Sequence, residues 1–152
     1  MSIQPATISR SSALETARSL IGQPFISSPV QADCFNGWTL IARCLGGRPP
    51  VFSPGWGPRD RWMAMSAFFS RGMKLTTLAS AQPGDVLVFN MGHDGYHAAI
   101  LSEVGGTEPK MISCQLGKAC CATWVGKYWT DRLVAVFTPV ASAAEAQMAE
   151  AA

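Results

Sequence analysis

Two residues, Cys34 and His97, have the side-chain types that nucleophilic hydrolysis requires. Cys34 stands where a loop rich in Pro and Ser gives way to an apolar run, so we expect it in the first turn of a helix. There the helix dipole and unpaired N–H groups lower the pKa of a thiol and favour the nucleophilic thiolate. His97 begins a strand-like run, and an imidazole that titrates near neutrality is the usual base for such a thiol.

A third polar group normally orients the histidine base. Ser113 and Gln115 are two residues apart on the next predicted strand, so they face the same side of the sheet, and either could orient His97. On spacing alone another interpretation stays open, in which Cys34 is a small buried side chain and His97 a hydrogen-bonded core residue.

The remaining cysteines, histidine and tryptophans indicate less specific roles. An odd count of five cysteines favours reduced thiols, and we interpret Cys44, near the end of the same helix as Cys34, as packing. His93 lies in a predicted turn, and without a C-x-x-C or H-E-x-x-H motif we expect no metal and no cofactor. Trp56 follows in a loop, where it is a candidate for stacking on substrate, with simple packing as the alternative.

The elements that must position these residues fall into two halves. Apolar residues recur at helical spacing in the first half, and strand-like runs between turn signals fill the second. Helices followed by an antiparallel sheet of about five strands are the α+β pattern. We expect Ser11 or Ser12 to cap the first helix. The predicted helices span 9–21, 34–45 and 59–71, and the predicted strands span 85–90, 96–103, 109–116, 119–125 and 132–138.

Composition predicts a single packed domain. The chain has 152 residues, 48% hydrophobic and 14% charged, which predicts one domain over 1–140 and an Ala-rich tail over 141–152. A net charge of +2 is too small to favour nucleic acid as a partner. No apolar run reaches the roughly 20 residues of a membrane span. The polar N-terminus lacks the apolar segment of a secretory signal, so we expect synthesis in the cytoplasm.

Three motifs follow one another along the chain: a "DC" pair before a glycine and an apolar helix, then "QPGDVLVF" at 82–89, then "HAAIL" at 97–101. In this order they resemble the motifs of the NlpC-like cysteine peptidase superfamily. The segment 111–137 is similar to the corresponding part of the phage and gene-transfer-agent tail peptidases of that superfamily. The resemblance covers roughly residues 10–138, and the last segment keeps Ile112, Gly117, Lys118, Trp129, Arg132, Leu133 and Phe137.

The resemblance implies a papain-like domain that hydrolyses amide bonds in cell-wall peptides, commonly beside D-Glu or diaminopimelate. By position it makes Cys34 the nucleophile and His97 the base, and the backbone N–H of Cys34 would stabilise the oxyanion. Asp33 matches the acidic residue before the family's cysteine, and we expect it to lie at the substrate. The implied partners are peptidoglycan stem peptides and other phage-tail or tail-tip proteins, in a virion tail that acts in the periplasm or cell wall.

The chain departs from the family pattern at three positions. Two residues, where the family usually has one, separate Cys34 from Gly37. The tail peptidases carry His at the position of Ser113, and the family's usual Tyr is Phe25. We therefore expect a peptidoglycan hydrolase of a phage-tail or gene-transfer-agent particle, with a weakened or inactive structural tail-tip or hub component as the alternative. A third interpretation is an amidase unrelated to phage.

Overall fold

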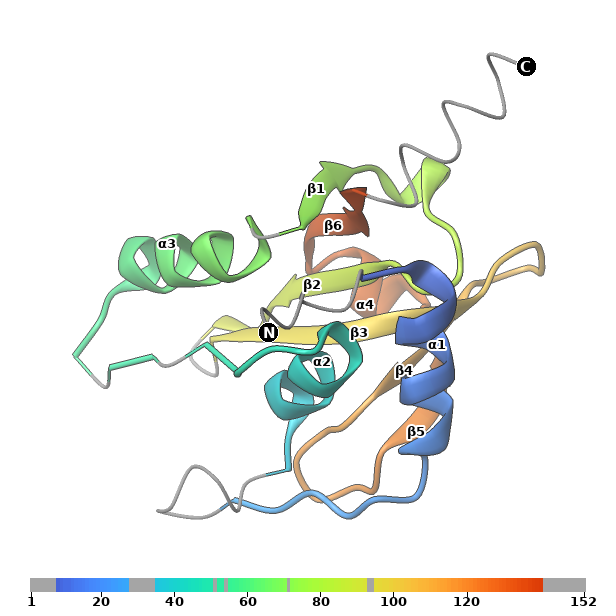
Figure 1. Cartoon of the computed structure of the whole chain (residues 1–152), viewed down its shortest axis with the longest axis horizontal. Coiled ribbons are helices and arrows are strands. Elements are labelled where there is room, and N and C mark those ends of the chain that lie inside the picture. The colour runs from blue at the N-terminus through green and yellow to red at the C-terminus, as the bar shows by residue number, and fades with distance from the viewer. Residues whose placement is uncertain are drawn as a thin grey trace, which may run out of the picture.

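The chain forms helices first and an antiparallel sheet second. The computed structural model describes residues 8–27, 35–50, 52–53, 55–70, 72–92 and 95–140. Within them, six strands form one sheet in the order β1-β6-β2-β3-β4-β5, and every neighbouring pair is antiparallel. Figure 1 shows α1 and α2 together in front of the sheet and α3 beside them. The predicted α+β class is confirmed.

The elements follow one another from blue to red in Figure 1. The helices are α1 (Arg10–Ser19), α2 (Gly37–Leu45), α3 (Pro58–Phe69), the 3-10 helix η2 (Leu78–Ser80) and α4 (Lys127–Thr130). The strands are β1 (Met73–Thr76), β2 (Val86–Asn90), β3 (Tyr96–Glu103), β4 (Lys110–Ser113), β5 (Cys121–Trp124) and β6 (Leu133–Pro139).

The predicted strands are all present, although three are shorter than predicted: β2 by one residue, β4 by four and β5 by three. β3 has the predicted bounds, whereas β4 ends at Ser113 and β5 begins at Cys121. Three elements were not predicted: β1, η2 and α4. Each has three or four residues, too few for a strand or helix period to stand out, and β1 is an edge strand that pairs with β6.

Two helices begin at other residues than the sequence predicted. Ser9, not Ser11 or Ser12, caps α1: its side chain accepts a hydrogen bond from the backbone N–H of Ser12 at 3.1 Å. The second helix was predicted over 34–45, but α2 begins at Gly37 with Asn36 as its N-cap. The cause is the same in both cases, because the capping side chain fixes where helical backbone begins.

Two apolar clusters cover the two faces of the sheet. The first joins α1, α2 and α3 to the sheet through Ala13, Ala17, Leu40, Ile41, Met65, Phe69, Val86, Val88, Ala98 and Ile100. The second lies against the opposite face, where Trp129 of α4 packs with Leu87, Phe89, Ala99, Leu101, Met111 and Val136. Alternate residues of β2 and β3 therefore point into different clusters, as the strand period requires.

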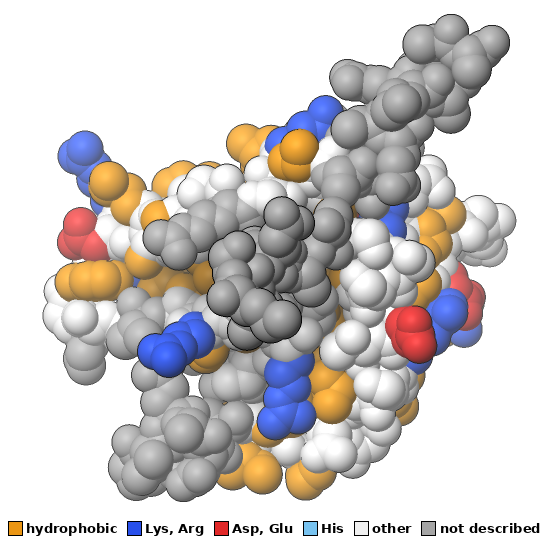
Figure 2. Space-filling model, viewed as in Figure 1, with side chains coloured by type: hydrophobic (Ala, Val, Ile, Leu, Met, Phe, Trp, Pro, Cys, Tyr) orange, Lys and Arg blue, Asp and Glu red, His pale blue; other side chains and the backbone are white. Residues whose placement is uncertain are grey.

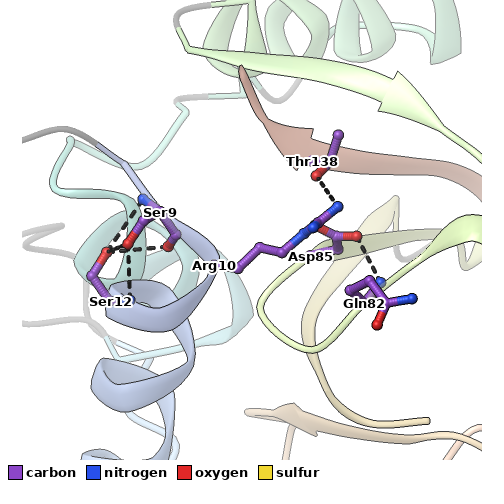
Figure 3. Close-up of polar contacts among 6 residues, drawn as sticks. All are labelled: Ser9, Arg10, Ser12, Gln82, Asp85 and Thr138. Carbon is purple, nitrogen blue, oxygen red and sulfur yellow. Dashed lines mark hydrogen bonds and ion pairs between the residues drawn. The ribbon is translucent and has the colours of Figure 1, made fainter. Parts of the chain in front are cut away.

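A buried ion pair ties the first helix to the sheet (Figure 3). The Asp85 side chain is fully buried, and one of its oxygens accepts a hydrogen bond from Nε of Arg10 at 2.9 Å. The other oxygen accepts from the backbone N–H of Gln82 at 2.9 Å. Arg10 also donates through Nη2 to Oγ1 of Thr138 at 3.0 Å. One guanidinium thus links α1, the entry to β2 and the end of β6.

Gly84 makes room for this junction. Its φ is +100°, a left-handed backbone that favours glycine, and a Cβ there would lie 2.6 Å from the Cα of Arg10. The "PGD" part of the motif therefore has a structural role: the glycine lets the chain pass the backbone of α1, and Asp85 binds the side chain of Arg10.

The described surface has no single basic patch on the face drawn in Figure 2, where Lys and Arg side chains occupy separate places. Among the described residues, no helix combines the length and apolar character needed to cross a membrane. The predicted tail, 141–152, lies outside the described residues.

Replacing Gly84 by alanine is expected to destabilise the domain strongly. Gly105 is the matched control, because it also has a left-handed φ, +93°, but open space around the added Cβ. Both substitutions carry the backbone strain, of about 1 kcal/mol, and only Gly84→Ala adds the clash with α1, which costs about 1–3 kcal/mol more. Urea unfolding of the two variants measures the difference in free energy of unfolding. Equal losses would contradict the role given to Gly84.

Candidate active site

His97 is the second residue of β3 and lies in an aromatic enclosure. It is paired with Phe89 across the β2–β3 ladder, and the two ring centroids are 6.3 Å apart. The ring centroids of Trp129, from α4, and of His97 are 5.4 Å apart. The enclosing rings restrict where the imidazole can lie.

The N-terminus of α2 meets the edge of this imidazole. A Cβ on Gly37 would lie 3.2 Å from both Cε1 and Nδ1 of His97, so the glycine permits a closer approach than other residues would. One position further along α2, the indole N–H of Trp38 donates to the carbonyl oxygen of Tyr96 at 3.0 Å. Helix α2 is thereby fixed against the strand residue that precedes His97.

Asn36 occupies the N–H groups that begin α2. Its Oδ1 accepts from the backbone N–H groups of Trp38 and Thr39 at 3.0 and 3.1 Å. In return, the backbone N–H of Asn36 donates to Oγ1 of Thr39 at 2.6 Å. The predicted start of this helix at residue 34 is therefore wrong: α2 begins at Gly37, and these two N–H groups already have an acceptor. The N-x-x-T pattern of a capping box is the signal in the sequence that marks this start.

The chain immediately after Cys34 is held by backbone hydrogen bonds. Phe35 and Ile26 exchange two of them, with N to O distances of 2.9 and 2.8 Å, and the thiol of Cys114 donates to the carbonyl oxygen of Phe35 at 3.7 Å. The Phe35 side chain is buried. The residues predicted to react or bind substrate just before it, Cys34 and Asp33, lie outside the described residues, as does His93.

Ser113 and Gln115 contact each other. Nε2 of Gln115 donates to Oγ of Ser113 at 3.2 Å, and Ser113 is fully buried at the end of β4. Nε2 of His97 is buried and has no hydrogen-bond partner in the described part of the chain. Neither predicted orienting group therefore bonds to that nitrogen, and packing against Phe89 and Trp129 holds the ring.

Burial makes the charged form of His97 costly. Removal from water lowers the pKa of His97 from 6.5 to about 4. The imidazole is therefore neutral near pH 7, which is the form that can accept a proton.

A cavity of about 370 Å³ opens at His97. Its aromatic lining comes from the loop after α1, from α2, from the start of β3 and from α4, through Phe25, Trp38, Tyr96, Tyr128 and Trp129. Its polar lining includes Asn36, His97, Cys114 and Gln115. The predicted substrate residue Trp56 is 37% exposed and is not among the residues that line this cavity. An apolar cleft with a few polar groups is typical of a small-ligand or peptide site.

Three of the described cysteines do not resemble activated nucleophiles. Cys44, Cys114 and Cys120 are buried, and Cys121 is partly exposed. Burial raises the pKa of Cys44 and of Cys120 to about 12 and also raises the pKa of Cys114. The packing role predicted for Cys44 agrees with its burial. Across the described ranges, no group of three His, Cys, Asp or Glu side chains has the geometry of a metal site.

Comparison with known proteins identifies the fold. No family model and no curated protein matches the chain. A crystal structure described as similar to a lipoprotein of the NLP/P60 family, from Staphylococcus aureus subsp. aureus Mu50, matches with a TM-score of 0.53 and 18% identity. The match covers 92% of this chain and 43% of that one.

Two crystal structures of Ly7917 also match, each with 14% identity and with 86% of this chain and 62% of that one covered. The TM-score is 0.51 for Ly7917 with the hydrolysis product of MDP and 0.52 for the other structure. The chain thus spans less than two thirds of the length of each of these proteins. The likeness shows that the chain shares an α+β fold with these structures, and the predicted fold class agrees with it.

The pKa of His97 predicts a pH-dependent stability. Between pH 6.5 and about 4 the unfolded chain binds a proton at this residue and the folded chain does not, so the stabilisation falls as pH falls. From about pH 7 to about pH 4.5 the loss from His97 is on the order of 2–3 kcal/mol. Urea unfolding at both pH values should show a smaller loss for His97→Gln than for the wild type, and His93→Gln is the control. An equal pH dependence in all three proteins would contradict the lowered pKa.

Thiol reactivity should separate Cys34 from the buried cysteines. In native protein carrying Cys121→Ala, we expect iodoacetamide at neutral pH to label Cys34 first, because burial suppresses the other thiolates. Peptide mass mapping after short exposures measures the order. Labelling of Cys44 or Cys120 as early as Cys34 would contradict the prediction.

Proposed function

We propose that this domain hydrolyses an amide bond in a cell-wall peptide, with Cys34 as the nucleophile and His97 as the base. The observation that carries the proposal is the contact between the start of α2 and the imidazole. Gly37, three residues after Cys34, approaches Nδ1 of His97 closely at the wall of an aromatic cleft. The extra residue between Cys34 and Gly37 is accommodated as the helix cap, Asn36, so the glycine still packs on the histidine.

In the first half of the reaction, Sγ of Cys34 attacks the amide carbonyl carbon while His97 takes the thiol proton. The carbonyl electrons move to oxygen and form a tetrahedral oxyanion. When the carbonyl reforms, the C–N bond breaks and His97 returns the proton to the leaving nitrogen. The products at this stage are a free amine and a thioester on Cys34.

In the second half, water attacks the thioester with His97 again as the base. The C–S bond breaks, the sulfur regains a proton from His97, and the new carboxylic acid leaves. His97 is neutral at the start of each half, in agreement with its lowered pKa. The surrounding rings disfavour the imidazolium that forms in each half of the reaction. Its positive charge must therefore be stabilised by the negative charge of the reacting groups, the thiolate and the oxyanion.

The proposed substrate is a peptidoglycan stem peptide. The aromatic side chains of the cleft suit the apolar parts of such a ligand, and the fold is that of an NLP/P60 structure and of Ly7917 with the hydrolysis product of MDP. The resemblance of segment 111–137 to tail peptidases supports a particle of the phage-tail or gene-transfer-agent type. In that setting the protein is a virion component made in the bacterial cytoplasm that acts in the periplasm or cell wall.

Digestion of sacculi tests the reaction. Wild-type protein incubated with Gram-negative sacculi should release new amino groups, and Cys34→Ala should lower the initial rate by at least about a thousandfold. The thiol that lines the same cleft, Cys114, is not expected to replace it, because it is buried, has a raised pKa and donates to the carbonyl oxygen of Phe35. Release is measured with an amine-reactive fluorophore.

Cys121→Ala is the matched control: it removes a thiol that is partly exposed, whereas Cys44 and Cys120 are buried, and it should keep the wild-type rate. Equal amine release by Cys34→Ala and the wild type would contradict the role of Cys34 as nucleophile. No amine release by the wild type between about pH 6 and 9 would contradict the proposed hydrolysis.

A specific observation favours a second function, in which the domain binds wall peptides as a tail-tip component with weakened catalysis. Nε2 of His97 has no hydrogen-bond partner among the described residues, so no side chain there accepts from that nitrogen when the imidazolium forms. Under this alternative, the wild type co-sediments with sacculi but releases no amine, and Cys34→Ala co-sediments equally well.

A further inference from the structure

A second cavity, of about 330 Å³, adjoins the cleft at His97. Tyr96 lines both cavities and precedes His97 directly in β3. The second cavity lies between α3 and the β2–β3 hairpin and is lined by Pro58, Arg61, Asn90, Gly92, Gly95 and Tyr96. A ligand bound at His97 could therefore extend past Tyr96 into it.

Arg61 is the charged group of this cavity. A Cβ on Gly95 would lie 3.3 Å from Nη1 of Arg61, so the glycine lets the guanidinium lie close against the hairpin. Next to it on α3, the ring of Trp62 packs on Tyr96 with centroids 5.9 Å apart, which fixes α3 against the start of β3. The position of Arg61 thus follows from the packing of α3 on Tyr96, the residue before His97.

The guanidinium has no counter-ion in the described structure. Nε of Arg61 is buried without a hydrogen-bond partner, and the ion pairs that the described residues form involve other side chains. The described lining of the cavity contains no Asp or Glu. A partly buried cation with unused donors favours an anion that can bind it.

We propose that Arg61 binds a free carboxylate of the peptide substrate, in a subsite joined to the reaction cleft at Tyr96. A guanidinium matches a carboxylate with two parallel N–H···O bonds, which gives both affinity and orientation. Oδ1 of Asn90 already accepts from the backbone N–H of Gly92 at 2.9 Å, so its remaining polar group is a further donor to an anion. This inference rests on the proposed function, because it assigns the substrate's carboxylate to that same site.

Binding of matched peptides tests the subsite. The probes are a stem tripeptide with D-Glu and diaminopimelate bearing free carboxylates and the same peptide with carboxamides, titrated calorimetrically into Cys34→Ala protein. In that background, Arg61→Gln should weaken binding of the free carboxylate peptide about tenfold or more and leave the carboxamide peptide unchanged. Arg59→Gln is the matched control, because Arg59 is an exposed arginine of the same helix.

Equal weakening of both peptides by Arg61→Gln, or no weakening, would overturn the proposal. Should Arg61→Gln lower the melting temperature, Arg61→Lys makes the same comparison, since it keeps the charge and stem but loses the two-pronged contact. Binding is measured without hydrolysis, so the two proposals can fail separately. If binding depends on the carboxylate but sacculi release no amine, the proposed hydrolysis is contradicted and the subsite is supported. If sacculi release amine but binding does not depend on the carboxylate, the subsite is contradicted and the hydrolysis is supported.

Discussion

The ion pair between Arg10 and Asp85 is the constraint on which the arrangement of helices and sheet depends. A fully buried carboxylate is costly unless its oxygens are paired, and here Arg10 and the backbone of Gln82 satisfy both oxygens. The pair fixes α1 at the entry to β2, with Gly84 allowing the close passage. Because α1 packs on α2 and α2 packs on β3, the place of α2 against His97 follows from this junction.

At the other end of the same chain of contacts, Gly37 and Trp38 bring α2 to β3. The glycine permits the approach to the imidazole, and the indole N–H binds the strand one residue earlier. Asn36, the residue before Gly37, caps α2 and so fixes where the helix begins. The two-residue spacing between Cys34 and Gly37 therefore does not remove the glycine's contact with His97, and the capping amide takes the N–H groups that a thiolate at the helix start would use.

Alternation and turn signals were enough to predict the fold class and the central strands. β3 could be predicted to the residue because its apolar run is long and turn residues lie on both sides of it, Gly95 before and Gly105 after. The start of α2 could not, since the apolar run beginning near Cys34 continues through Phe35 and only the capping side chain marks the boundary. The contact of Trp129 with His97 joins residues distant in sequence through a four-residue helix, which no local pattern encodes.

The enclosure that positions His97 also limits its chemistry. Aromatic rings exclude water and lower the pKa of the imidazole, so a proton taken from a thiol is held weakly. In related mechanisms a third polar group offsets this cost, whereas Ser113 and Gln115 here bond to each other. On the proposed mechanism, the charge that offsets it must come from the reacting groups, the thiolate and the oxyanion. Catalysis in this cleft would then depend more on accurate placement of the peptide than on a pre-formed ion pair, which is the placement that a carboxylate contact at Arg61, beside Tyr96, would supply.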